Sequence, residues 1–161
     1  MKIFTVTNEK LISTALLVLR IALAAIFFAH GAQKVLGVFG GKGLEATVSG
    51  MSGKFGPVLP YFTAFVEFLG GIAMLLGILT RFFGIALLIN MLVAVFAVHL
   101  QNGFFAPTGF EFPFSLAMTS LAITLAGPGL YSLDYILFNP RQRSQTTFAV
   151  PGGSATFRPV S

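Results

Sequence analysis

The sequence predicts an all-α integral membrane protein, built as a bundle of four transmembrane helices, on three observations. First, 55% of the 161 residues are hydrophobic and only 9% are charged, whereas about a quarter of the residues in soluble domains are charged. Second, the chain holds four apolar runs, each close to the ~20 residues that cross a hydrocarbon core, and one small soluble domain could not bury them all. Third, the runs are continuous and lack a period of two, which argues against a β-barrel.

Glycine, proline and charged residues mark the ends of the expected helices. The four transmembrane helices are expected at residues 12–36, 57–79, 82–100 and 113–130. The segment 37–56 holds seven glycines and three charged residues, so we expect a loop outside the bilayer with a short helix near residues 44–51. Only Thr80 and Arg81 separate the second and third helices, which predicts a tight helical hairpin.

Residues 1–138 are expected to form the transmembrane domain, and residues 139–161 a basic tail whose composition is typical of disorder. Lysines and arginines are more frequent near one set of helix ends than near the other. The first set is Lys2, Lys10, Arg81, Arg141, Arg143 and Arg158, and the second is Lys34, Lys42 and Lys54. The positive-inside rule then places both termini and the tail in the cytoplasm. Because these bases flank apolar runs, the net charge of +5 indicates membrane topology, and we expect a lipid bilayer rather than nucleic acid as the partner.

Two charged residues, Arg20 and Glu67, lie inside apolar runs, where an unpaired charge is costly and marks a candidate functional site. At about 100° per residue, Arg20, His30 and Lys34 fall within an arc of about 80° and form a polar stripe. Glu67 shares a face with small residues, which allow close helix packing. We expect Arg20 and Glu67 to pair directly or through water, with His30 as a second partner of Glu67. The alternative is an ion pair that only fixes helix register.

The third apolar run contributes Asn90 to the candidate site, on a face that it shares with small residues. His99 falls about 180° from Asn90 on the helical wheel, so we expect it outside the polar cluster. That position disfavours a haem held by His30 and His99. At the cytoplasmic ends of the helices, Asp134 is expected beside Arg81 as a structural ion pair.

The absence of cysteine excludes several kinds of redox chemistry. The chain forms no disulfide, holds no iron–sulfur cluster through its own thiolates and performs no thiol–disulfide exchange. It also carries no evident metal-ligand or flavin motif, so we expect no metal site and no intrinsic cofactor. Electron transfer would then depend on a bound quinone or quinol, or on a partner subunit.

Several stretches combine glycines and charges in an order typical of one family of membrane proteins. They are Leu19-Arg20 and residues 27–34 (FFAHGAQK), 66–71 (VEFLGG), 76–81 (LGILTR) and 127–134 (GPGLYSLD). With the combined order H-G-x-x-K, E-x-x-G-G and T-R, residues 13–138 resemble the DoxX family of small bacterial four-helix membrane proteins. The resemblance implies a cytoplasmic (inner) membrane protein linked to respiratory-chain or thiol-stress redox functions. The family's namesake is associated with thiosulfate:quinone oxidoreduction and a terminal quinol oxidase.

Three functions fit these residues. In the first, the protein is a non-catalytic subunit or accessory factor of a membrane redox system and interacts with a quinone or quinol. Its partner is then a redox subunit or a second copy of the chain. His30 or Lys34 then hydrogen-bonds a quinone carbonyl, Glu67 relays protons, and Arg20 and Asn90 are further binding candidates. In the second, it is a scaffold that docks soluble redox enzymes through its glycine-rich loop or basic tail. In the third, it transports a small metabolite or a proton, although no inverted repeat is visible.

Overall fold

The computed structural model of the protein describes residues 8–138, and every regular element in this part of the chain is helical. The elements are α1 (Glu9–Val35), α2 (Gly43–Phe55), α3 (Val58–Leu76), α4 (Thr80–Ala94), the π-helical turn η2 (Val95–His99), the 3₁₀ turn η3 (Leu100–Asn102), α5 (Glu111–Ala126) and α6 (Leu133–Phe138). The predicted tail at 139–161 lies outside the described residues.

Three helices are long and apolar enough to cross a membrane, and a fourth is apolar but shorter. The three are α1, α3 and the continuous helical stretch Thr80–Asn102, and the fourth is α5, with 16 residues. The predicted all-helical, multi-pass membrane fold is thus confirmed. α5 ends before the predicted residue 130 because Gly127 has a φ of +88°, and because Pro128 has no amide hydrogen to continue the helix.

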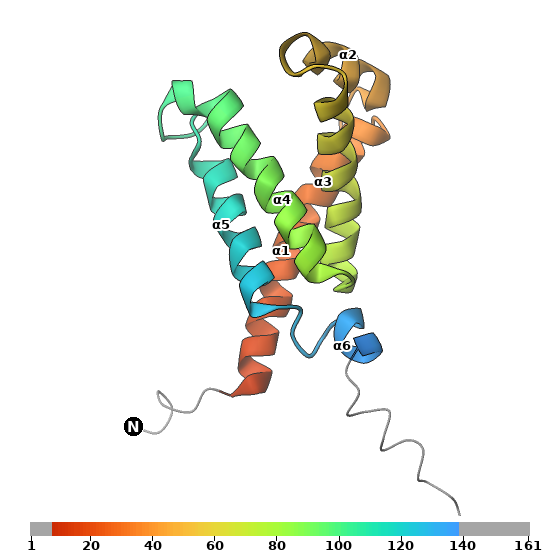
Figure 1. Ribbon diagram of the computed structural model, residues 1–161, viewed down its shortest axis with the longest axis vertical. Helices are drawn as coiled ribbons and strands as arrows, with labels where there is room; N and C mark the ends of the chain where they lie inside the picture. Colours follow the sequence, from red (N-terminus) through yellow and green to blue (C-terminus); the bar gives the residue numbers. More distant parts are fainter. Residues whose placement is uncertain (1–7, 139–161) are drawn as a thin grey trace, which may run out of the picture.

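Figure 1 shows that the long helices form two pairs, α1 with α3 and α4 with α5. α4 follows α3 through the tight hairpin predicted around Thr80, and the two pairs diverge away from that hairpin. α2 lies at the diverging end, against α3 and α1. The short α6, which the sequence did not predict, lies at the hairpin end. We call these two ends of the molecule the α2 end and the α6 end.

The buried core lies between the two pairs of helices. Its largest apolar members are Leu23 and Phe27 of α1, Met74 of α3, Leu87 of α4 and Ile123 of α5. Many other large apolar side chains are exposed on the outer faces of the bundle, as expected where lipid replaces water. The core therefore joins the two pairs, and their outer faces suit the bilayer.

α1 and α3 cross at two glycines that let their backbones touch. A Cβ atom on Gly31 would lie 2.3 Å from the backbone nitrogen of Phe68, and one on Gly71 would lie 2.5 Å from the backbone nitrogen of Phe28. Small residues of this kind are what allows membrane helices to approach closely. At the crossing, the helical turn that follows Gly31 in α1 lies beside the helical turn that precedes Gly71 in α3. This contact explains why the lysine follows the glycine in the H-G-x-x-K pattern and the glutamate precedes the glycines in the E-x-x-G-G pattern.

Replacing Gly71 with alanine should destabilise the protein by about 1–3 kcal/mol, the usual effect of overpacking a tight contact. The matched control is Gly53→Ala, because a Cβ on Gly53 of α2 would meet no atom within 4 Å, and alanine is the better helix former. We expect the midpoint of thermal unfolding, followed by circular dichroism in detergent, to fall for Gly71→Ala and to stay level or rise for Gly53→Ala. Equal midpoints for the two variants would contradict the described crossing.

Candidate functional site

Arg20 of α1 is 1% exposed, and its guanidinium donates hydrogen bonds to backbone carbonyls. Nε donates to the carbonyl of Met74 at 2.9 Å, and Nη2 to that of Leu75 at 3.2 Å. Nη1 donates to the carbonyls of Pro128 and Tyr131 at 2.8 and 2.9 Å. Arg20 thus joins α1 to the end of α3 and to the segment between α5 and α6.

These contacts make Arg20 a cap for the C-terminus of α3. The carbonyls of the last turn of a helix have no partner inside it, and the helix dipole favours a positive charge there. The predicted direct pairing of Arg20 with Glu67 is wrong, because backbone carbonyls accept the hydrogen bonds of the guanidinium. A helical wheel identifies the face on which Arg20 lies but cannot reveal acceptors at the end of another helix.

Asp134 caps the other side of the same hairpin. Its Oδ1 accepts a hydrogen bond from the amide of Leu79, and its Oδ2 one from the amide of Thr80, both at 2.8 Å. These amides begin α4, where the helix dipole favours a negative charge. The predicted ion pair between Asp134 and Arg81 is not formed. Among the described residues, the one ion pair that is formed joins Lys34 to Glu67.

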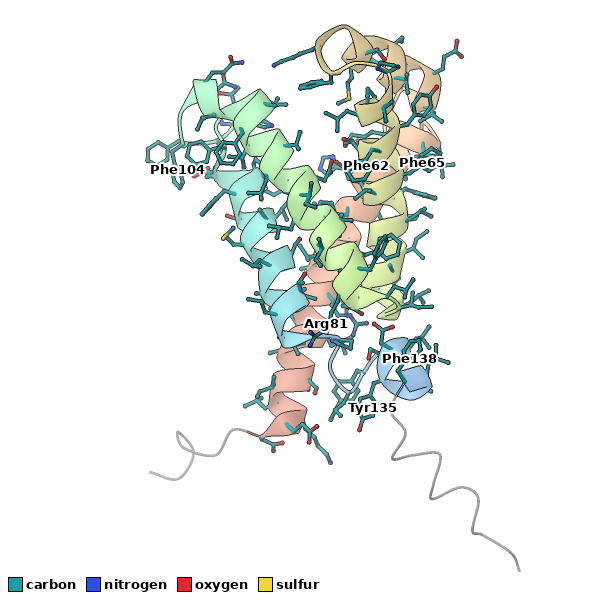
Figure 2. The ribbon with its side chains drawn as sticks, viewed as in Figure 1. Phe62, Phe65, Arg81, Phe104, Tyr135 and Phe138 are labelled. Carbon is teal, nitrogen blue, oxygen red and sulfur yellow. The ribbon has the colours of Figure 1, made fainter. Side chains whose placement is uncertain are left out.

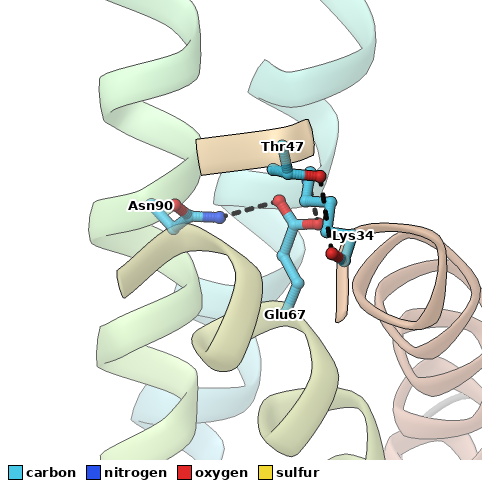
Figure 3. Close-up of polar contacts among 4 residues, drawn as sticks. All are labelled: Lys34, Thr47, Glu67 and Asn90. Carbon is cyan, nitrogen blue, oxygen red and sulfur yellow. Dashed lines mark hydrogen bonds and ion pairs between the residues drawn. The ribbon is translucent and has the colours of Figure 1, made fainter. Parts of the chain in front are cut away.

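Glu67 of α3 is 4% exposed and is held by side chains from two other helices (Figure 3). Nζ of Lys34, from α1, donates to Oε2 in a close ion pair. Nδ2 of Asn90, from α4, donates to Oε1 at 3.1 Å. Asn90 therefore takes the place expected for His30, since no hydrogen bond joins His30 to Glu67 in the described part of the chain. A buried carboxylate that has both a counter-ion and a further donor is the arrangement in which burial is tolerated.

Two adjoining cavities, of about 280 and 240 Å³, meet at this ion pair on the α2 side of the core. His30 and apolar side chains of α1 and α5 line the first, and Asn90, Thr63 and two side chains of α2 line the second. The residues that line both are Lys34, Glu67, Met91, Ala94 and His99. The structure thus brings four of the predicted site residues, His30, Lys34, Glu67 and Asn90, to two neighbouring cavities that share part of their walls. Arg20 lines neither cavity.

His99 faces both cavities, so its predicted exclusion from the polar cluster is wrong. The wheel assumed regular α-helix as far as His99, but Val95–His99 forms a π-helical turn, which inserts one extra residue into the helix. This insertion moves His99 from about 180° to about 80° from Asn90. Nδ1 of His99 lies 2.8 Å from the carbonyl of Thr108. Because a carbonyl only accepts hydrogen bonds, Nδ1 is the donor in this contact.

Sequence reasoning also missed Lys54, which links α2 to the opposite helix pair. Its Nζ donates to the carbonyl of Ala97 in η2 at 2.9 Å. Met51 and Phe55 from the same helix line the second cavity. The spacing of Met51, Lys54 and Phe55 at i, i+3 and i+4 was a usable signal, because residues so spaced share one helix face. α2, expected only as a short helix, therefore covers the second cavity.

The comparisons with known proteins agree with this arrangement of motifs. The family model described as DoxX matches residues 15–100, which is more than half of the chain and includes Lys34, Glu67, Asn90 and His99. The chain belongs to the DoxX family. A Bacillus subtilis (strain 168) protein named "Putative oxidoreductase CatD" is 30% identical to this DoxX protein over 135 aligned residues, and the match covers 81% of this chain and 92% of the relative. No solved structure matches this chain.

Replacing Lys54 with methionine should make the second cavity of this DoxX protein more accessible, because the hydrogen bond from α2 to η2 is lost. The chain has no cysteine of its own, so the substitution Thr63→Cys places a unique thiol on the cavity wall. We expect a water-soluble maleimide to label this thiol about fivefold faster in the Lys54→Met background, the factor for a hydrogen bond of about 1 kcal/mol. The control is Lys42→Met, at the exposed start of α2. Labelling at one rate in both backgrounds would show that Lys54 does not hold α2 over the cavity.

Proposed function

We propose that this DoxX protein binds a quinone or quinol in the two adjoining cavities, as a non-catalytic subunit or accessory factor of a bacterial membrane redox system. The observation that carries the proposal is the Lys34–Glu67 ion pair, which lies where the two cavities meet. Small-molecule sites typically combine apolar walls with a few convergent polar groups. Buried titratable groups that face such a space are candidates for function.

The side chains around the cavities match the chemistry of a quinone. A quinone has a flat, mainly apolar ring whose carbonyl oxygens accept hydrogen bonds, and its reduction to a quinol takes up two electrons and two protons. The ammonium of Lys34 can donate to a carbonyl, as can His30 of the same stripe. The carboxylate of Glu67 can accept a proton released by a quinol and pass it on. A partner redox subunit would exchange the electrons.

Two further findings support a redox role in a membrane. The printed name of the Bacillus subtilis relative describes that protein as an oxidoreductase, and the long apolar helices of this chain suit the bilayer in which quinones dissolve. We also propose the bacterial cytoplasmic membrane as the location, with both termini in the cytoplasm. The α2 end, with its two cavities, then lies toward the outer side.

Removing both charges of the ion pair should weaken quinone binding without unfolding the protein. A single Lys34→Met substitution leaves Glu67 buried and unpaired, which is strongly destabilising, so the informative variant is Lys34→Met with Glu67→Gln. We expect this double variant to bind a short-chain quinone at least about tenfold more weakly than wild type in lipid nanodiscs, because charge-assisted hydrogen bonds contribute about 1.5–3 kcal/mol each. Calorimetric titration measures the affinity.

The matched control is Lys10→Met with Glu45→Gln, which changes the same charges at exposed positions. This control should bind quinone like the wild-type protein and unfold at the same temperature. If the wild-type protein binds no quinone, or if the Lys34/Glu67 double variant binds it with wild-type affinity, the proposed function is wrong.

A further inference from the structure

We infer that the α6 end of the protein carries a binding site for an anionic phospholipid, distinct from the cavities proposed for quinone. The site is a hollow of about 510 Å³ between the start of α4 and α6. Two features that the proposed function leaves unexplained meet there, the Thr80-Arg81 pair of the T-R pattern and Asp134. Figure 2 labels Arg81 of α4 with Tyr135 and Phe138 of α6 at this end of the molecule.

The hollow lies at the depth where lipid head groups are expected. The helical stretch Thr80–Asn102 has 23 residues, and at ~1.5 Å per residue it is slightly longer than the ~30 Å hydrocarbon core. Its first residues therefore reach one boundary of that core. A hollow beside Thr80 is open to the phosphate and glycerol groups of the adjacent leaflet.

The charges around the hollow leave one positive charge without a partner. Arg81 is exposed, and no ion pair to it is found among the described residues. Both oxygens of Asp134 are engaged by the amides that begin α4, and the guanidinium of Arg20 is held by backbone carbonyls. Arg81 and Asp134 line the hollow, whereas Arg20 is buried behind it. Arg81 is thus the charged group there that is free to meet the single negative charge of a phosphodiester.

An unpaired hydroxyl points independently to a ligand in the same hollow. Thr80 lines the hollow and is fully buried. Among the buried side-chain oxygen and nitrogen atoms of the described residues, Oγ1 of Thr80 is the one that has no hydrogen-bond partner. Buried hydroxyls are normally paired. The hydroxyl is closed to solvent, so a phosphate oxygen would accept this hydrogen bond, while it faces Arg81, once the wall of the hollow shifts to admit it.

Apolar side chains at the rim of the hollow provide the surface for acyl chains. Phe82 of α4 and Phe138 of α6 are 65% and 70% exposed, and both line the hollow. Tyr135 adds an aromatic ring with a polar tip, the type of side chain that gathers at membrane–water interfaces. Head-group phosphate and acyl chains thus have separate, adjoining surfaces, which favours a phospholipid over a free anion.

The test compares lipids bound to the full-length protein. We reconstitute detergent-purified protein with equal amounts of phosphatidylglycerol and phosphatidylcholine, and measure the retained lipids by native mass spectrometry. The wild-type protein should retain phosphatidylglycerol preferentially, and Arg81→Gln should lower this preference about fivefold, the effect expected for one basic residue near an anionic head group. The matched control is Lys42→Gln at the α2 end, which should keep the wild-type preference.

Thr80→Val separates lipid binding from folding, because it keeps the shape of the side chain and removes the unpaired hydroxyl. We expect weaker retention of phosphatidylglycerol, together with a melting temperature in lipid-free detergent at least as high as that of the wild-type protein. The inference is overturned if phosphatidylglycerol is not preferred, or if Arg81→Gln and Lys42→Gln behave alike. Stabilisation by inorganic phosphate equal to that by phosphatidylglycerol would indicate a free-anion site and would likewise overturn it.

Discussion

The hydrocarbon core of a bilayer offers no hydrogen-bonding partner, so each charged side chain inside it must find a partner within the protein. Arg20 finds the carbonyls at the end of α3, and Glu67 finds Lys34 and Asn90. At the edge of the bundle, Asp134 finds the amides that begin α4. These three sets of contacts bind α1 to α3, α3 to α4, and α6 to the hairpin that joins α3 and α4. The positions of the helices and of the cavities depend on this requirement.

The same requirement separates the charges that maintain the fold from those that can act on a ligand. Arg20 and Asp134 are bound to the backbone at the ends of two consecutive helices, where each complements the dipole of its helix. Lys34 and Glu67 instead bind each other beside open space, and the side chain of Lys34 is 25% exposed. A ligand that reaches this pair can exchange hydrogen bonds with it without opening a helix end. The candidate site is therefore at Lys34 and Glu67, near the glycine crossing of α1 and α3.

The sequence predicted the helices well, because the length of an apolar run and the glycine or proline at its end act locally. The polar faces of α1 and α3, and the inward position of Asn90, also followed from regular helical periodicity. Three features could not be predicted in this way. The carbonyls that accept hydrogen bonds from Arg20 belong to residues far from Arg20 in the sequence. The cap formed by Asp134 likewise joins residues that are far apart in the chain. The π-helical turn changes the direction of His99, and the composition gives no signal of it.

Lys34, and not Arg20, is the charge partner of Glu67. Two double-mutant cycles test it through the free energy of unfolding in mixed micelles, one combining Lys34→Met with Glu67→Gln and the other combining Arg20→Gln with Glu67→Gln. We expect a coupling energy above about 1 kcal/mol for the Lys34–Glu67 cycle and within about 0.5 kcal/mol of zero for the Arg20–Glu67 cycle. Strong coupling between Arg20 and Glu67, with none between Lys34 and Glu67, would contradict this assignment of the partner of Glu67.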